Sequence, residues 1–140
     1  MTRVIFSRHW GVLVAGVLLS ACSAGAPSFV LPDRSTAAVQ RAEARAATVM
    51  EAYAIEEMAV PGESSPSRCK VRLLRQVAST SYIFAECSVG YGGFVGPHKV
   101  EGDVVTAPDD GSFYGPSIRR IFPADIAEAL TSENEQRFRP

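Results

Sequence analysis

The chain has 140 residues with 14 basic and 15 acidic side chains, so its net charge at pH 7 is −1. This balance lacks the basic signature of a nucleic-acid-binding protein, and the length suits one small domain. With only two histidines and three cysteines, the chain has few potential ligands for a structural zinc site.

The start of the chain has the layout of a secretory signal peptide. Residues 1–10 carry Arg3, Arg8 and His9 but no acidic residue, and residues 11–21 are almost entirely apolar or small. A helix over this apolar run would rise only about 16 Å, roughly half the thickness of a bilayer core. The run therefore predicts a cleaved signal rather than a permanent transmembrane helix.

Leu19-Ser20-Ala21-Cys22 ends the apolar run and resembles the lipobox of bacterial lipoproteins. The resemblance covers only this segment. It implies that the Cys22 thiol receives a diacylglycerol and that residues 1–21 are then cleaved off. Two or more acyl chains anchor a protein stably, at about 0.8 kcal/mol per buried methylene, whereas one chain binds a membrane only marginally. The alternative is an ordinary secreted protein with an incidental cysteine.

The resemblance implies an extracytoplasmic protein that is anchored in a membrane, its partner, through the lipid on Cys22. In diderm bacteria, serine rather than aspartate after the cysteine favours the outer membrane. The mature chain would have 12 basic and 15 acidic residues, a net charge of −3. We expect residues 22–34 to form the lipidated N-terminus and a tether, residues 35–131 a single domain, and residues 132–140 a polar tail that frays.

A helix is predicted to follow the tether, with Ser35 as its N-cap. Its apolar residues recur at helical spacing and form one stripe, which consists of Val39, Ala42, Ala46, Val49, Met50 and Tyr53. This stripe is interrupted near its end, where Ile55 points away from it and Glu57 falls on it, so the helix should bend or stop there.

Residues 69–77 and 82–89 alternate in polarity and predict two strands. In a hairpin that turns around residues 77–79, Cys69 lies opposite Cys87 and Lys70 lies opposite Glu86, a favourable charge pair. A slip of one residue would place the two cysteines on opposite faces of the sheet. A neighbouring even-step register, or a bridge between non-adjacent strands, remains open.

Once Cys22 is lipidated, Cys69 and Cys87 are an even pair in an oxidising compartment, which predicts one disulfide. The alternatives are two free thiols or a pair of metal ligands. Because no third cysteine and only one histidine remain, we expect no metal site.

Residues 89–98 contain four glycines and one proline but match no phosphate-binding pattern. The favoured interpretation is a bulge or wide turn between strands. The alternative is a flexible binding loop that presents Tyr91, Phe94 and His98.

The rest of the chain predicts two further strands and a helix. Residues 100–107 contain three valines and suggest a third strand. Pro108-Asp109-Asp110-Gly111 is a strong turn signal, after which residues 112–118 are expected to return as a short fourth strand. Pro123 predicts the start of a second helix.

No catalytic constellation is recognisable, so the sequence predicts no enzymatic activity and no cofactor. His98 would need a serine beside it to act in nucleophilic catalysis, and no nucleophile elbow is present. Asp109 and Asp110 lack the spacing of a calcium loop. A cationic patch facing anionic lipids or wall polymers is a weaker alternative to a solvated face, and its members would be Lys70, Arg72, Arg75, Arg119 and Arg120.

Together these elements predict an α+β fold, in which an N-terminal helix packs on an antiparallel sheet of three to four strands and a short C-terminal helix follows. The order of one helix before a meander is similar to cystatin-like and other roll folds. The expected function is that of an envelope lipoprotein whose domain binds an envelope protein or a cell-wall component and no nucleic acid. Two alternatives are a periplasmic inhibitor or immunity-type protein that uses the glycine segment as a plug, and an envelope hydrolase that uses His98.

Overall fold

The computed structural model describes residues 29–58, 60 and 66–140, so the predicted signal peptide, the lipobox and Cys22 lie outside the described residues. Within the described part of the chain, no helix is long and apolar enough to cross a bilayer. The elements, in chain order, are α1 (Ala37–Met58), β1 (Ser67–Val77), β2 (Thr80–Val89), β3 (Gly92–Glu101), β4 (Val104–Thr106), the 3-10 helix η1 (Gly111–Phe113), α2 (Tyr114–Ile121), α3 (Ala124–Ser132) and the 3-10 helix η2 (Glu135–Phe138).

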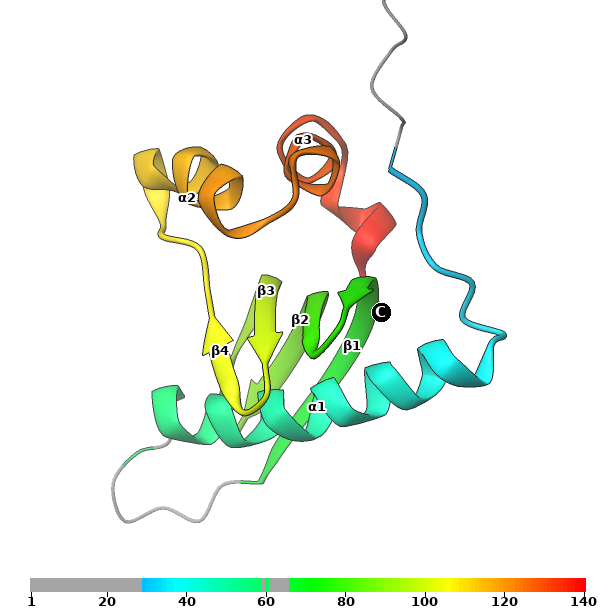
Figure 1. The fold of residues 1–140 in the computed structure, drawn as a ribbon. Coiled ribbons are helices and arrows are strands. Elements are labelled where there is room, and N and C mark those ends of the chain that lie inside the picture. The colour runs from blue at the N-terminus through cyan, green and yellow to red at the C-terminus, as the bar shows by residue number, and fades with distance from the viewer. Residues whose placement is uncertain (1–28, 59, 61–65) are drawn as a thin grey trace, which may run out of the picture.

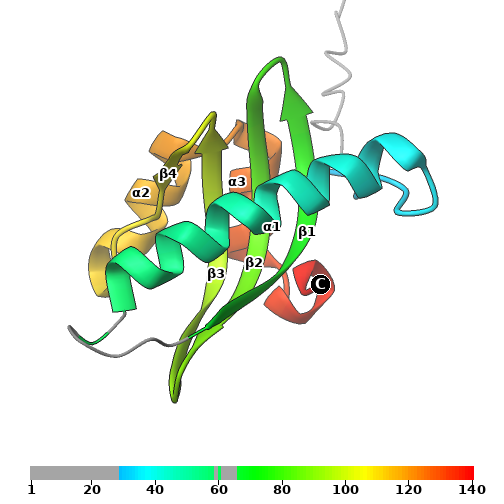
Figure 2. The same cartoon turned by 90° about the horizontal axis from the view of Figure 1, so that it is seen from below.

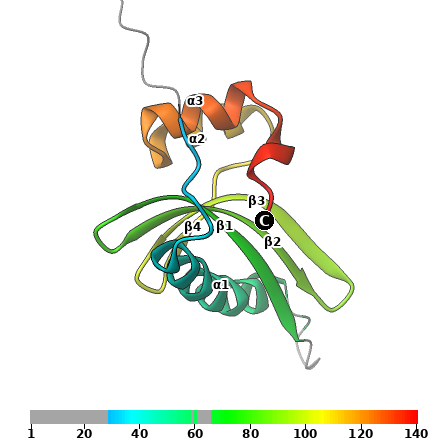
Figure 3. The ribbon, with the colours of Figure 1, turned by 90° about the vertical axis from the view of Figure 1, so that its right-hand side faces the viewer.

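The four strands form one antiparallel sheet in the order β1-β2-β3-β4. Figure 1 shows α1 on one side of this sheet and the C-terminal helices on the other. Viewed from below, α1 runs obliquely across the strands (Figure 2). The side view shows the sheet between two helical layers (Figure 3). The predicted α+β fold is therefore confirmed, with an additional helical layer on the second face.

The predicted register of the first hairpin is confirmed. Cys69 pairs with Cys87 and Lys70 pairs with Glu86, and the two cysteines form a disulfide. A β-bulge at Leu74 then shifts the register by one residue, so that Arg75 pairs with Tyr82. The bulge directs Leu74 and Arg75 to the same face of the sheet, the one that the C-terminal helices cover.

Each face of the sheet has its own apolar core. On the α1 face, Met50 and Ala54 are fully buried against the inward side chains of the strands, among them Val71 and Ile83. On the other face, Leu74 and Phe84 pack against the C-terminal helices. The second face is therefore apolar where the C-terminal helices cover it, at Leu74, Tyr82 and Phe84, whereas the pair of Lys70 and Glu86 keeps another part of the same face polar.

The ends of the packed unit differ from the expected domain limits. Phe29 is only 5% exposed, and its ring lies 6.2 Å from the ring of Phe138, which is fully buried. The Arg137 guanidinium also donates to the Phe29 carbonyl at 3.1 Å. Residues 29–34 therefore pack on the domain and are not part of the tether. The predicted polar tail at 132–140 is likewise packed on the domain as far as Phe138, rather than frayed.

The predicted fourth strand at residues 112–118 is wrong, because this segment forms η1 and the start of α2. Tyr114, Ile118 and Ile121 recur at helical spacing and contact the second core. Pro116 lies in the first turn of α2, where its missing N–H has no partner to lose. The run is too short for the spacing to distinguish a helix from a strand by itself.

The glycine segment is a strand rather than a loop. Gly90 and Tyr91 form a two-residue turn, and β3 begins at Gly92. Gly90 has a φ of 55°, which suits this turn. The third strand therefore starts earlier than predicted, and the expected strand at 100–107 is divided by the Gly102-Asp103 turn between β3 and β4.

Candidate functional site

A cavity of about 330 Å³ lies at the open edge of β3. The short β4 pairs only with Lys99–Glu101, so the β3 edge before Lys99 has no neighbouring strand within the described chain. Side chains from both helical layers meet around this edge. The lining residues come from α1 (Tyr53, Glu57, Met58), β3 (Phe94, Val95, Gly96, Pro97, His98), the chain after β4 (Ala107, Pro108, Asp110), α2 (Tyr114) and η2 (Glu135).

Three rings from α1 and β3 pack together on one side of the cavity. The ring centroids of Tyr53 and Phe94 are 6.0 Å apart, and those of Tyr53 and His98 are also 6.0 Å apart, both in edge-to-face arrangements. Phe94 and His98 lie 5.3 Å apart. Because the two β3 residues are four positions apart, they lie on the same face of the strand, toward α1.

His98 is a buried strand residue of β3, rather than part of a wide turn or a flexible loop. It is 5% exposed, and its Nδ1 lies 3.0 Å from the Gly96 carbonyl oxygen. Because a carbonyl oxygen only accepts, Nδ1 carries the proton and Nε2 keeps a lone pair. Nε2 has no hydrogen-bond partner among the described residues. Burial lowers the pKa of His98 to about 4, opposed by the bond to Gly96, so the ring is neutral near pH 7.

Three exposed carboxylates, those of Glu57, Asp110 and Glu135, stand around the rings, and no lysine or arginine is among the lining residues. The Tyr114 hydroxyl donates to Glu135 Oε1 at 3.4 Å. Burial, together with the Glu135 charge, raises the pKa of Tyr114 to about 12. Burial also raises the pKa of Tyr53, with smaller contributions from Glu57 and Glu56. The cavity therefore has a negative electrostatic environment.

The backbone of β3 adds acceptors to this edge. Two-residue turns close both neighbouring hairpins, with Val89 opposite Gly92 and Glu101 opposite Val104. Alternate residues of β3 then direct their backbone groups to opposite sides, and the odd-numbered ones face the open edge. Val95 and Pro97 thus present carbonyl oxygens there, while Pro97 has no N–H to donate.

The sequence-predicted candidates fall into separate places. Phe94 and His98 meet in the cavity, whereas Tyr91 is fully exposed at the β2–β3 turn and does not line it. The Cys69–Cys87 disulfide joins β1 to β2. The described residues contain no group of three or more histidine, cysteine, aspartate or glutamate side chains that could hold a metal ion.

Two arginines of the considered cationic patch form part-buried ion pairs, and a third, Arg120, forms an exposed one with Asp109 at 3.2 Å. Arg72 lies 3.8 Å from a Glu43 oxygen, and Arg75 binds Asp125 on α3 through both of its terminal nitrogens. The Arg75 guanidinium holds the pKa of Asp125 below its usual value. These two guanidinium groups are therefore committed to the fold rather than to a shared cationic surface.

The residue types around His98 suit binding better than nucleophilic catalysis. Among the described residues that line the cavity there is no serine, threonine or cysteine, so the only hydroxyls beside His98 are the phenols of Tyr53 and Tyr114, whose pKa values are raised by burial. What the cavity offers instead is aromatic surface and hydrogen-bond acceptors.

Four contributors, Tyr53, Glu57, Tyr114 and Glu135, were not recognised as site residues in the sequence. Only Glu57 gave a signal, because a carboxylate interrupts the apolar stripe of α1 one turn after Tyr53. Tyr114 and Glu135 reach the cavity from elements far along the chain, and no local pattern connects them to β3.

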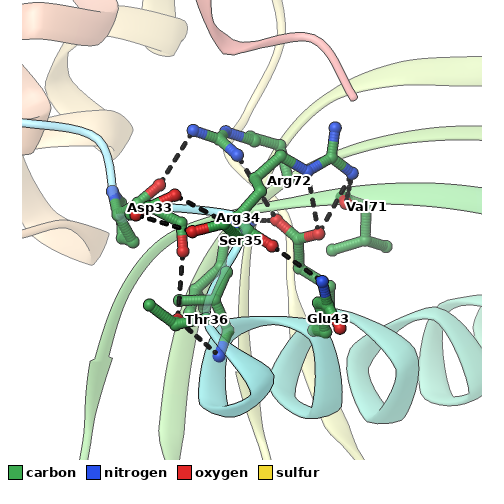
Figure 4. A network of polar contacts seen from close by, with 11 residues as sticks. Asp33, Arg34, Ser35, Thr36, Glu43, Val71 and Arg72 are labelled. Atoms are coloured by element: carbon green, nitrogen blue, oxygen red, sulfur yellow. Dashed lines mark hydrogen bonds and ion pairs between the residues drawn. The ribbon is translucent and has the colours of Figure 1, made fainter.

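A polar network fixes the chain that enters the domain (Figure 4). The Arg34 side chain donates to Glu43 on α1 at 3.1 Å, and the Arg72 guanidinium donates to the Pro32 carbonyl at 3.0 Å. At the start of α1, Thr36 accepts the Val39 N–H at 3.4 Å, so Thr36 rather than the expected Ser35 caps the helix.

Comparisons of the chain with protein-family models, with curated proteins and with solved structures gave no match. Neither a family nor a relative supplies a function for the cavity.

Proposed function

We propose that this chain is an extracytoplasmic lipoprotein, anchored through acyl chains on Cys22, whose domain binds an envelope protein or a cell-wall component without catalysing a reaction. The lipobox resemblance supports the anchor. The observation that carries the binding role is the edge cavity, which combines half-buried aromatic rings and a buried, neutral His98 with exposed carboxylates and has no serine, threonine or cysteine among its described lining residues. Concave sites with aromatic surface and a few polar groups are typical of ligand binding.

The anchor would hold the domain close to the membrane. Phe29 is packed on the domain, which leaves only residues 22–28 as tether. A fully extended chain spans at most about 3.3–3.6 Å per residue, so this tether reaches roughly 25 Å. A partner would therefore be captured near the lipid surface.

The disulfide is consistent with this location. Structural disulfides persist in oxidising compartments such as the periplasm and the cell surface, and are rare in the cytosol. The bond between Cys69 and Cys87 joins the two strands at directly opposed positions of the first hairpin.

Mass spectrometry of the amino terminus tests the anchor. We expect a mature chain that begins at Cys22, carries the mass of a diacylglycerol and partitions into the detergent phase. In the Cys22→Ala variant this mass and the partitioning should be lost. An intact Met1 on a soluble chain with reduced Cys69 and Cys87 would overturn the proposal.

Crosslinking in intact cells tests the binding role. We expect the anchored protein to recover a reproducible envelope partner, and Phe94→Ala to reduce that recovery because it removes a ring from the cavity. Tyr91→Ala is the matched control, since it removes an aromatic side chain that does not line the cavity. Recovery that is unaffected by Phe94→Ala would contradict the assignment of binding to this cavity.

A further inference from the structure

We propose that the cavity at the open edge of β3 binds a positively charged alkylammonium or guanidinium group. This inference deepens the proposed function and rests on it, because it names the ligand chemistry of the same site. Such a group could be a lysine or arginine side chain of an envelope protein, or the amino group of a smaller envelope compound.

The polar groups of the cavity are mostly acceptors. Three carboxylates line it without a lysine or arginine among the lining residues, and the β3 edge adds the carbonyl oxygens of Val95 and Pro97. An ammonium group has three donors and a guanidinium group has five, and neither has an acceptor. A cationic group is therefore the complement of this set, while an anion would be repelled by three carboxylates and would find only neutral donors, such as the tyrosine hydroxyls and the Val95 N–H.

The ring surface provides the second part of the site. Tyr53, Phe94 and Tyr114 come from three different elements and all line the cavity. A cation within about 6 Å of an aromatic ring is attracted by the negative charge on the ring face, and the attraction increases where water is excluded. Carboxylates around aromatic faces thus favour a cation over a neutral group of the same shape.

The unpartnered imidazole nitrogen points independently to a ligand. His98 is more than nine-tenths buried, lines the cavity and has Nδ1 engaged with the Gly96 carbonyl. Its Nε2 lone pair has no donor among the described residues. Among the described residues Nε2 is not one of the fully buried unpartnered atoms, so this acceptor is accessible from the cavity, where a donor from a bound ammonium or guanidinium group would satisfy it.

Two other features of the molecule fit such a ligand less well. A second cavity, of about 560 Å³ beside α1 and the β1–β2 turn, has no aromatic residue among its described lining residues and so lacks the ring surface. Addition of a peptide strand to the open edge of β3 is disfavoured by Pro97, which cannot donate a ladder hydrogen bond. A side chain or amine entering the cavity is the occupant that fits.

A titration of the purified full chain in detergent, with 15N-labelled histidine, tests the proposal. The probes are the N-acetyl methylamides of arginine, lysine and citrulline, the last of which has the shape of arginine without its charge. We expect saturable shifts of the His98 imidazole signals with the two cationic probes, with a Kd on the order of 1 mM, and at least threefold weaker binding of citrulline. Raising the salt concentration should weaken the cationic probes alone.

Variants identify the residues involved. Glu57→Gln and Glu135→Gln should each raise the Kd of the arginine probe about threefold or more. Glu128→Gln removes the same charge from an exposed carboxylate on α3 that does not line the cavity, and should leave the Kd unchanged. Equal binding of citrulline, equal effects of all three variants, or no saturable shift at probe concentrations far above the millimolar range would overturn the proposal.

The two sources of the cation are then separated by a glycine-flanked arginine peptide and by 1,5-diaminopentane. Tighter binding of the peptide supports a protein side chain, and tighter binding of the diamine supports a small envelope amine. The proposed function fails separately, through the mass of the amino terminus and the crosslinking experiment. A partner whose capture depends on Phe94 but which competes with none of the cationic probes would preserve the binding role and contradict the cationic ligand.

Discussion

Glu43 is the residue at which α1, β1 and the entering chain are joined. Its carboxylate is buried, with Oε2 accepting from Arg34 and Oε1 accepting from the Leu73 N–H at 2.9 Å. Arg72 lies 3.8 Å away, and its Nη1 has no hydrogen-bond partner among the described residues. The Glu43 charge therefore compensates a guanidinium group that is largely removed from water.

We expect Glu43→Ala to lower the free energy of unfolding by about 3 kcal/mol, because it leaves the buried Arg72 charge uncompensated and the Leu73 N–H without an acceptor. Urea unfolding followed by circular dichroism measures this loss. Glu43→Gln should lose less, since its amide oxygen can still accept from Leu73. Glu128→Ala, on an exposed part of α3, should stay within about 0.5 kcal/mol of the wild type. Equal stability of the Glu43→Ala variant and the wild type would contradict this account.

His98 makes stability depend on pH. In the folded chain burial lowers the pKa of His98 to about 4, whereas an unfolded histidine titrates near 6.5. Between these two values the unfolded state binds more protons, so stability falls as the pH falls from 6.5 to 4. The full effect is roughly 3 kcal/mol, from 1.36 kcal/mol per pKa unit. Unfolding free energies at pH 7 and pH 4 should show this loss.

The His98→Phe variant isolates this contribution, because it keeps a flat ring but cannot bind a proton. Carboxylates such as Asp125, whose pKa is lowered by Arg75, contribute equally to the pH dependence of both proteins. The wild type should therefore lose roughly 3 kcal/mol more than His98→Phe between pH 7 and pH 4. Parallel pH profiles of the two proteins would mean that His98 is already protonated in the fold or lies in contact with water.

At the scale of elements, the first hairpin could be predicted because several constraints agree. Alternation, the charge pair of Lys70 with Glu86 and the two cysteines all specify one register, and a slip by one residue would break each of them. The sequence also contained a sign of the second helical layer, because Leu74 and Phe84 are apolar residues on the face of the two strands that alternation predicts to be polar. That exception signals a strand buried on both sides.

Other elements carried too little local information. Residues 112–118 form a short segment in which helical and alternating spacing compete, and contact with the second core favours the helix. Phe138 is a single apolar residue in a polar tail, so no periodicity marks its burial. The cavity joins five parts of the chain, and only the position of Glu57 on α1 hinted at it. The short helix, the buried Phe138 and the cavity share one cause: tertiary contacts determine each of them, and the local sequence alone is ambiguous there.

The 3-10 helix η2 attaches the C-terminus to the second core through Phe138. Its ring is fully buried between Phe29 and Phe84, with centroids 6.2 Å and 6.3 Å away. We expect Phe138→Ala to cost about 3–5 kcal/mol in unfolding free energy, as is typical of a large aromatic removed from a core. Thermal unfolding measures this cost. Arg139→Ala, at the exposed neighbouring position, is the control, and a similar small effect of both variants would show that the tail frays after all.

The disulfide stabilises the β1–β2 hairpin chiefly by restricting the unfolded chain. Cys69 and Cys87 are separated by 18 positions, for which the chain-entropy model gives about 3 kcal/mol. The double variant Cys69→Ala and Cys87→Ala should therefore unfold at lower urea concentration by that free energy. Reductant should destabilise the wild type by a similar amount and leave the double variant unchanged. If reductant has no effect on the wild type, the two thiols are not bonded in solution.

At the scale of the whole molecule, η2 connects the proposed anchor to the candidate site. Glu135 lines the cavity, and Phe138, three residues later, packs on Phe29. At about 2 Å of rise per residue, these two contacts of η2 lie roughly 6 Å apart along its axis. The tether therefore leaves the domain beside the element that contributes Glu135, and a short tether would keep the cavity near the lipid surface.

This arrangement predicts an orientation that can be measured on the lipidated protein in nanodiscs containing a paramagnetic headgroup lipid. Figure 1 places η2 on the side of the sheet where the described chain begins, and the β3–β4 turn on the α1 side. The amide signal of Arg137 should therefore broaden more than that of Asp103 in the β3–β4 turn. Inserting a flexible stretch of about 12 glycine and serine residues before Phe29 should reduce this difference, because the longer tether lets the domain reorient. Equal broadening at both positions with the native tether would show that the short connection does not orient the domain, and the cavity would then face the membrane no more often than any other surface.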